Sequence, residues 1–275
     1  AGTCPECRLR CVRLLAGTRT DVPVSADVEA FQFALDVDAD VVSNSWGFVD
    51  PTPIPAGLRA IIESVITTGR SGLGALVLFA AGNDDRELQP YEIENVTGVI
   101  TVGAVNNFDE ATAYSNRGEA VDVVAPTGTL TTDLTGAAGE NPTDYTGNFG
   151  GTSSACPVVA GVAGLLVSAA PASSGAELAD ALIQTARPSI FGTPDARGHD
   201  VTYGYGRIVP AAALRRALGV PEPQPDAGAS IPDAGADGGP PSMGPGGCGC
   251  ATTSRAPSAW WLLSLVWLRR RSRAR

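Results

Sequence analysis

The chain has 275 residues, 44% of them hydrophobic, and carries a formal net charge of −10 at pH 7. That amount of apolar material suffices for one large core with appendages. The acidic balance argues against a nucleic-acid partner, because a phosphate backbone is bound by basic surfaces, and five of the arginines stand among the last seven residues.

The first half of the chain alternates between strand-like and helix-like patterns. Helices are predicted over 25–37, where apolar residues recur at helical spacing, and over 56–68, which Gly69 ends. The segments that predict strands are 8–14, 40–44, 75–80, 99–102 and 121–124. Strands that alternate with helices predict an α/β fold, with three αβα layers around a mostly parallel sheet.

The second half is predicted to be helical before its composition changes. A buried helix is predicted over 157–170, a capping box of Ser174 and Glu177 opens a second helix toward Ala186, and a short third helix covers 210–218.

Three segments divide the chain. Residues 1–218 are predicted to form a folded domain, and 219–247 a disordered linker rich in Pro, Gly and Asp. Residues 248–275 form a tail of cysteines, an apolar Trp-rich stretch and arginines. The apolar stretch, 256–268, is predicted to be a short hydrophobic helix of about half the ~20 residues that a membrane-spanning helix needs.

Short motifs carry the chemistry. Residues 151–157 read GTSSACP and place a serine among small residues before a predicted helix, whose positive end can stabilise a developing oxyanion. Residues 79–83 read FAAGN and place an amide after a buried strand. Further motifs lie at 2–15, 40–47 and 203–208. In this order, the motifs resemble those of the subtilase family of serine proteases, over residues 2 to about 218.

The resemblance implies a role for each matching residue. Ser153 would be the nucleophile of a serine endopeptidase, forming an acyl-enzyme with its peptide substrate, and Asn83 would donate to the oxyanion. The residues that the resemblance assigns to substrate binding are Ser45, Trp46, Gly47, Asp50, Ala81, Gly82 and Thr152. The chemistry requires no cofactor. Structural calcium is a family expectation, but no spacing here identifies its ligands, so the metal ligands stay unassigned.

The proton-transfer half of the catalytic apparatus is not found in these residues. Subtilases use an Asp and a His that both precede the serine, whereas the only histidine, His199, follows it. We therefore expect the Asp and His upstream of Ala1, with residues 1–218 as the C-terminal two-thirds of the catalytic domain and this fragment alone inactive. His199 is expected to be structural or solvent-facing, in a surface turn.

Two alternatives to a peptidase stay open. The chain could be a non-catalytic, surface-displayed binding module that kept the subtilase scaffold. It could also be an α/β-hydrolase that uses Ser153, a downstream aspartate and His199, because that chain order would fit.

A subgroup resemblance concerns substrate preference. The turn 45–47, Asp50 and the stretch 69–74 resemble the kexin and furin branch, in which acidic residues favour basic side chains before the scissile bond. The acidic loop 84–87 could add to this charge, bind calcium, or be a solvated loop.

The six cysteines do not form one framework. Cys4, Cys7 and Cys11 favour a disulfide or buried thiols over zinc, because the second pair of a four-ligand zinc site is missing. The other cysteines are Cys156, Cys248 and Cys250.

The tail predicts a location. From residue 246 onward, the sequence GGCGC, the apolar stretch and the arginines resemble the MYXO-CTERM sorting tags of myxobacterial surface proteins. The resemblance implies export, with attachment to the cell surface or outer envelope through the tail, or secretion after its cleavage. A peripheral amphipathic tail without processing is the alternative. The expected partners are polypeptide substrates and, through the tail, a membrane; a monomer is expected.

Overall fold

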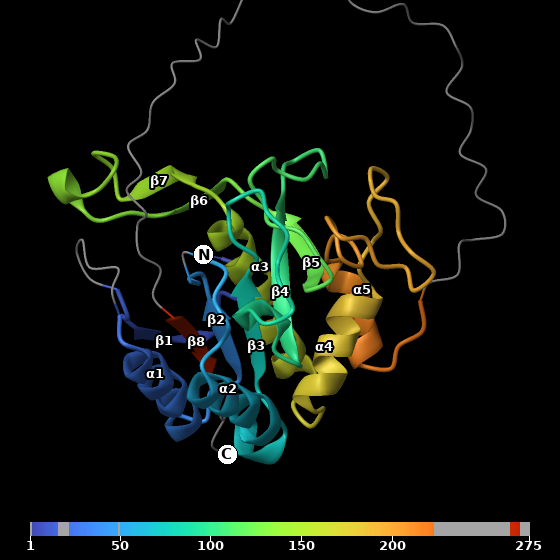
Figure 1. The fold of residues 1–275 in the computed structure, drawn as a ribbon, viewed down its shortest axis with the longest axis horizontal. Coiled ribbons are helices and arrows are strands. Elements are labelled where there is room, and N and C mark those ends of the chain that lie inside the picture. Colours follow the sequence, from blue (N-terminus) through green and yellow to red (C-terminus); the bar gives the residue numbers. More distant parts are fainter. Residues whose placement is uncertain (1, 16–21, 49, 223–264, 270–275) are drawn as a thin grey trace, which may run out of the picture. The chain divides into compact units, whose positions relative to one another are not determined.

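A six-stranded sheet forms the centre of the computed structural model, which describes residues 2–15, 22–48, 50–222 and 265–269 (Figure 1). The strand order is β1-β8-β2-β3-β4-β5. The strands are β1 (Arg8–Val12), β2 (Val41–Asn44), β3 (Leu76–Ala80), β4 (Val99–Val105), β5 (Val121–Pro126) and β8 (Leu265–Arg269). Strands β2 to β5 pair in parallel, as predicted, so their carboxyl ends share one edge of the sheet.

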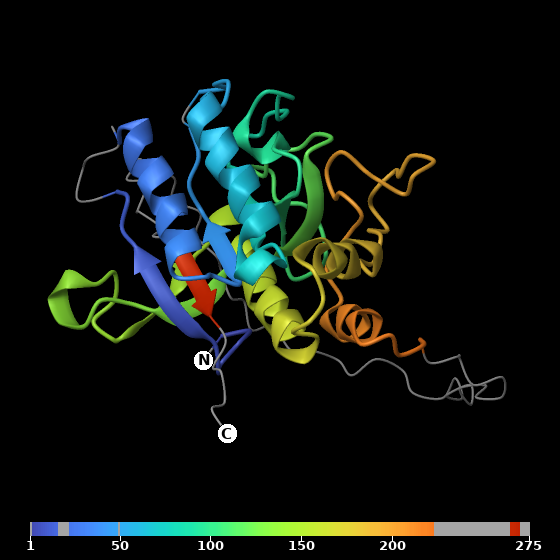
Figure 2. The same ribbon diagram turned by 90° about the horizontal axis from the view of Figure 1, so that it is seen from below.

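Helices cover both faces of this sheet (Figure 2). The helices are α1 (Val24–Asp36), α2 (Ala56–Thr68), α3 (Thr152–Ala169), α4 (Gly175–Gln184) and α5 (Pro210–Ala217). Short 3-10 turns are η1 (Arg70–Gly72), η2 (Ile93–Asn95) and η3 (Gly136–Ala138), and a separate antiparallel pair consists of β6 (Thr129–Thr132) and β7 (Tyr145–Phe149). Helices α1 and α2 pack on one face and α3 to α5 on the other, which confirms the predicted three-layer fold.

The two-sided burial of the sheet follows from the alternation of side chains along each strand. In β3, Leu76 and Leu78 join the core beneath α3 and α4, while Val77 and Phe79 join the core beneath α1 and α2. Successive residues of a strand point to opposite faces of the sheet, and helices cover both faces, so all four side chains are buried.

Helix α3 begins at Thr152, ahead of the predicted start at Pro157, so Ser153 is the second residue of the helix. Pro157 is the sixth residue of the helix, so its missing N–H removes one helical bond, the one to the Ser153 carbonyl. The helix is long and apolar enough to cross a membrane, but 67% of it is buried inside the protein. It is therefore the central core helix of the domain.

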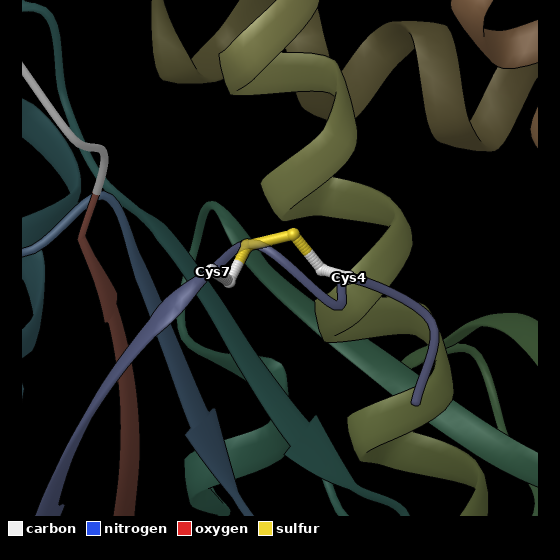
Figure 3. Close-up of a disulfide and its surroundings, with 2 residues drawn as sticks. All are labelled: Cys4 and Cys7. Carbon is white, nitrogen blue, oxygen red and sulfur yellow. A yellow bond between two sulfur atoms is a disulfide. The ribbon is translucent and has the colours of Figure 1, made fainter. Parts of the chain in front are cut away.

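A disulfide joins Cys4 and Cys7 in the segment that precedes β1 (Figure 3). This segment lies against α3, where a Cβ on Gly161 would come within 2.6 Å of the Thr3 side chain. The expected disulfide is thus confirmed for two cysteines, while Cys11 is an exposed free thiol. Cys248 and Cys250 lie outside the described residues.

The described part of the tail differs from the predicted hydrophobic helix. Leu265–Arg269 form the strand β8, which pairs antiparallel with both β1 and β2. The helix was predicted from apolar content alone, whereas Leu, Val and Trp side chains also suit a strand, and pairing on both sides satisfies its backbone. The rest of the tail, and the linker from residue 223, lie outside the described residues.

Candidate active site

The candidate site lies where the carboxyl ends of β2, β3 and β5 meet the start of α3. Three hydrogen bonds join these segments. Thr127 Oγ1, beyond β5, donates to the Gly151 carbonyl at 2.9 Å, and the Gly82 N–H, beyond β3, donates to Thr152 Oγ1 at 3.1 Å. Ser45 Oγ, beyond β2, donates to the Ser153 carbonyl at 3.1 Å. Ligand sites of parallel α/β sheets are typically found at this edge.

Ser153 is half-buried in the first turn of α3, and its hydroxyl is not hydrogen-bonded to any described residue. Backbone N–H groups in a first turn have no acceptor within the helix, and they lie at the positive end of the helix dipole. The carbonyl of Ser153 would normally accept from residue 157, but Pro157 has no N–H. The bond from Ser45 replaces it and joins β2 to the nucleophile's own backbone.

Asn83 faces the same helix start. Its Oδ1 accepts from the Thr152 N–H at 2.8 Å and from Thr152 Oγ1 at 3.1 Å. Because a backbone N–H can only donate, the oxygen of the amide must face Thr152. The Nδ2 group has no hydrogen-bond partner among the described residues and lies beside Gly151, two residues before Ser153. Gly151 keeps this space open, since it has φ 74° and a Cβ there would lie 3.1 Å from Asn83 Oδ1.

The arrangement can stabilise negative charge that develops on an oxygen near Ser153. The donors are the Asn83 amide and the backbone N–H of Ser153, since the Thr152 N–H is bound by Asn83 and the Ser154 N–H by the Gly151 carbonyl. Both are fixed before any reaction occurs. Such an arrangement suits the tetrahedral intermediate of acyl transfer to a serine.

Asn116 positions the loop that carries Asn83, and sequence reasoning missed it. Its Nδ2 donates to the Ala81 carbonyl at 2.9 Å, and its Oδ1 accepts from the N–H groups of Asp84 at 2.9 Å and Arg86 at 3.2 Å. The residue is only 1% exposed. No pattern near it signals this role, because its partners are about 30 residues earlier in the chain.

The predicted substrate-binding segments 45–47 and 81–82 both lie at the start of α3, and their residues differ in burial. Trp46 packs edge-on against Phe79, with ring centroids 5.5 Å apart, and donates to Asn44 Oδ1, so its ring serves the core. Gly47 is exposed beside it. Ala81 is buried, with its N–H bonded to the Val102 carbonyl and its carbonyl to Asn116.

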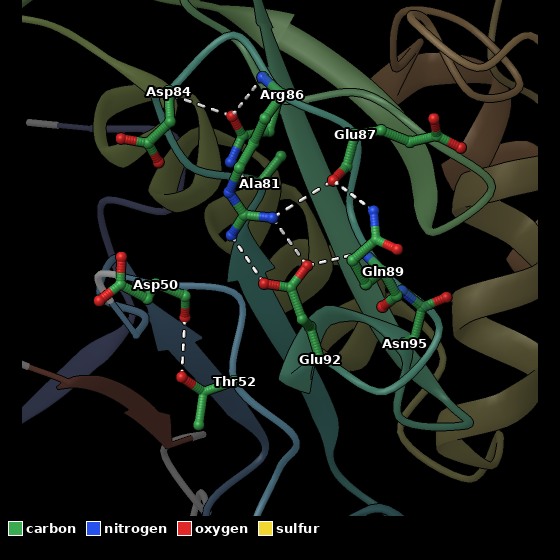
Figure 4. A network of polar contacts seen from close by, with 10 residues as sticks. Asp50, Thr52, Ala81, Asp84, Arg86, Glu87, Gln89, Glu92 and Asn95 are labelled. Carbon is green, nitrogen blue, oxygen red and sulfur yellow. Dashed lines mark hydrogen bonds and ion pairs between the residues drawn. The ribbon is translucent and has the colours of Figure 1, made fainter.

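The acidic loop is arranged around an ion pair rather than around a cation site (Figure 4). Arg86 binds Glu92 with both terminal nitrogens, at 2.8 and 2.7 Å, while the carboxylates of Asp50 and Asp84 point away from this pair. Asp50 is exposed. Among the described residues, no three His, Cys, Asp or Glu side chains gather in a way that could hold a metal.

His199 is buried, at 5% exposure, so the expected structural role holds and a solvent-facing position does not. Its Nε2 lies 2.8 Å from the Val121 carbonyl, at the start of β5, and its ring packs edge-on against Tyr205. Gly151, two residues before Ser153, accepts from Thr127 beyond the opposite end of that strand, and the six residue steps from Val121 to Thr127 correspond to roughly 20 Å. His199 therefore cannot act as the base of an α/β-hydrolase triad with Ser153.

Cys156, one helical turn after Ser153, is fully buried and is not an alternative nucleophile. Its Sγ lies 3.6 Å from the Asn44 carbonyl and 3.7 Å from Ser43 Oγ. Burial raises the pKa of the thiol to about 11, so the thiol stays protonated at neutral pH.

Comparisons with known proteins agree with this geometry. The sequence profile of the subtilase family matches residues 1–206. The calcium-dependent protease of Trichormus variabilis is 33% identical over 257 residues, covering 81% of this chain, and subtilisin E of Bacillus subtilis is 30% identical over 216 residues, covering 77%. The chain spans 38% of the length of the first relative and 50% of the second.

Solved structures show the same fold. The prenylagaramide maturation protease PagA superposes with a TM-score of 0.61 at 21% identity, covering 76% of this chain and 72% of that one. A protease of Pseudoalteromonas arctica superposes with a TM-score of 0.57 at 27% identity, covering 72% and 60%.

Proposed function

The chain belongs to the subtilase family, and from this premise we propose that it works in a serine endopeptidase whose nucleophile is Ser153. The observation that carries the proposal is the Asn83 amide, whose oxygen is bound by Thr152, so that its N–H groups are left to donate next to the start of α3.

In the proposed reaction, Ser153 Oγ attacks the carbonyl carbon of the scissile peptide bond while its proton passes to a general base. The carbonyl oxygen becomes an oxyanion, which accepts from Asn83 Nδ2 and from the first turn of α3. The C–N bond then breaks, the leaving amine takes the proton, and water hydrolyses the acyl-enzyme with the base acting again.

The general base and its orienting carboxylate are proposed to come from polypeptide upstream of Ala1. The family order places both before the serine, and the one histidine of these 275 residues is buried at the far end of β5. Residues 1–218 would then be the C-terminal two-thirds of the catalytic domain, consistent with relatives that are longer than this chain.

Export is proposed because the Cys4–Cys7 disulfide suits an oxidising compartment and an extracellular serine proteinase of a Thermus species is among the similar proteins. Attachment to the cell surface through residues 248–275, polypeptide substrates and a monomeric state complete the proposal.

Structural calcium is proposed because two similar chains are named calcium-dependent proteases. Since the described residues gather no such metal-binding cluster, no catalytic step is assigned to calcium. If calcium is bound, a chelator should lower the thermal unfolding midpoint, and added calcium should restore it better than magnesium does. A midpoint that does not respond to chelation would contradict this part of the proposal.

The test is labelling of the full gene product by a fluorophosphonate probe, which reacts only with an activated serine. We expect labelling that Ser153→Ala abolishes and that Ser64→Ala, on the surface of α2, leaves unchanged. If the folded protein is not labelled, or if Ser153→Ala is still labelled, the peptidase proposal is wrong, and a non-catalytic binding module becomes the better account of the scaffold.

A further inference from the structure

Glu94 presents a buried carboxylate to the open space beside Gly47. The residue belongs to η2 and is only 8% exposed. Apart from the two adjoining residues of the chain, a Cβ placed on Gly47 would have Glu94 Oε1, at 3.5 Å, as its single described neighbour within 4 Å. The side of Gly47 that a side chain would occupy is therefore empty except for this carboxylate oxygen.

The carboxylate of Glu94 forms no ion pair with the described residues, although the charge of Arg86 acts on it from nearby. The nearby guanidinium of Arg86 is bound by Glu92 through both terminal nitrogens, and Glu92 also accepts from the Gln89 N–H at 2.6 Å. Glu94's backbone carbonyl accepts from Thr101 Oγ1, at 2.9 Å, and its carboxylate is bonded only to its own backbone N–H. Burying a carboxylate without a partner is unfavourable, so a cation that reached it would be bound.

Glu94 lies close to the reaction site. Ser45 donates to the backbone of Ser153, and the exposed Gly47 follows two residues later, a distance of roughly 7 Å in extended chain. A long side chain from a substrate residue bonded next to Ser153 can cover that distance. The exposed Asp50 is less suited to this role, because water screens its charge.

We propose that Glu94 selects a basic side chain, arginine or lysine, on the substrate residue before the scissile bond, by binding its charged end beside Gly47. The inference rests on the proposed peptidase function and adds the substrate class. A guanidinium can bind a carboxylate with two parallel hydrogen bonds, so arginine should be preferred over lysine. A metal ion is a poorer occupant, because the described residues gather no group of three possible ligands there.

The test compares two peptides that differ only in arginine or citrulline before the scissile bond, cleaved by the full gene product. Citrulline keeps the shape and removes the charge. We expect kcat/KM to favour arginine by roughly tenfold to hundredfold, as for a hydrogen bond to a charged group, and Glu94→Gln to abolish most of this ratio. Asp50→Asn and the surface variant Glu63→Gln should preserve it.

The pH dependence of the ratio gives a second readout. Burial raises the pKa of Glu94 to about 7. The nearby Glu92 adds to this rise, and the positive charge of Arg86 opposes it. The arginine-to-citrulline ratio should therefore fall as the pH drops through this value, because the carboxylate becomes neutral. Effects on Ser153 and its base divide out, since both peptides use them equally.

The outcomes separate the two claims. If both peptides are cleaved equally, or if Glu94→Gln keeps the preference for arginine, the selection by Glu94 is wrong while the peptidase stands. Loss of the preference in Asp50→Asn instead would move the specificity to that residue. If the folded protein cleaves no peptide at all, both the peptidase and the selection are overturned.

Discussion

At the scale of single residues, the proposed catalysis depends on which hydrogen-bond donors near Ser153 are left free. Ser153 and Asn83 could be assigned from the sequence, because the short motifs around them resemble a known family. The fixed orientation of the Asn83 amide could not, since it depends on Thr152, 69 positions later in the chain. Asn116 and Glu94 were missed for the same reason: the partners of Asn116, and the Gly47 that Glu94 faces, come from distant segments.

Asn83 provides the first test at this scale. Replacing it with alanine removes an oxyanion donor without touching the nucleophile, so kcat should fall about 10²- to 10³-fold while KM changes little; this magnitude is the one known for such a donor in subtilisin. Steady-state kinetics on a peptide substrate measures both constants. Asn148→Ala, at an exposed position, is the control, and an unchanged kcat in Asn83→Ala would contradict the assignment.

Asp122 provides a test through pH. Burial raises the pKa of its carboxyl from 3.8 to about 7. The hydrogen bond that the carboxyl accepts from the Thr101 N–H lowers the pKa and offsets part of this rise. The native state therefore binds this proton more tightly than the unfolded state, and the group's contribution to stability is lost as pH rises through about 7.

In Asp122→Asn, the decrease in thermal unfolding midpoint between about pH 5 and about pH 8 should be smaller, since the amide oxygen still accepts from Thr101 and never ionises. Asp144→Asn, at an exposed position, should leave the decrease unchanged. An equal decrease in wild type and Asp122→Asn would show that the Asp122 carboxyl does not titrate in this range.

At the scale of elements, the sequence predicted most of the structure because local patterns decide it. The capping box of Ser174 and Glu177 is present with both of its bonds at the start of α4, and the alternation of strands and helices produced the parallel sheet. The start of α3 was misplaced, because the Ser45 bond that compensates for Pro157 joins segments 108 residues apart.

The sequence of the stretch 69–74 resembles the kexin branch. In the structure, its arginine makes contacts that hold the fold together. Arg70 is 4% exposed and joins three parts of the fold. It pairs with Asp40 and donates to the carbonyls of Gly74, Pro171 and Ser173. These contacts connect the residue before β2 to the turn between α3 and α4.

Arg70→Lys should therefore destabilise the protein although the charge is kept. An ammonium group cannot reach the same set of acceptors as a planar guanidinium, and each buried carbonyl left without a donor costs about 1–3 kcal/mol. Urea unfolding should show a loss of about 2–4 kcal/mol for Arg70→Lys and almost none for Arg10→Lys on the exposed surface of β1. Equal stability of the two variants would rule out this role.

At the scale of the whole molecule, helices packed on both faces of the sheet position the candidate active site. Helices α1 and α2 fix one face of the sheet and α3 the other, so the ends of β2, β3 and β5 can hold Ser153, Asn83 and the 45–47 segment together. The tail resisted prediction because apolar content without periodic spacing does not distinguish a helix from a strand, and part of it pairs as β8.

The central claim is that Ser153 becomes acylated. The most direct measurement is to mix the full gene product with a slowly deacylating ester, quench the reaction, digest the protein, and locate the added acyl mass by peptide mass spectrometry. We expect the mass on Ser153, in an amount that approaches one per protein and that Asn83→Ala greatly reduces. An acyl group on another residue, or none on Ser153 in folded protein, would contradict the account.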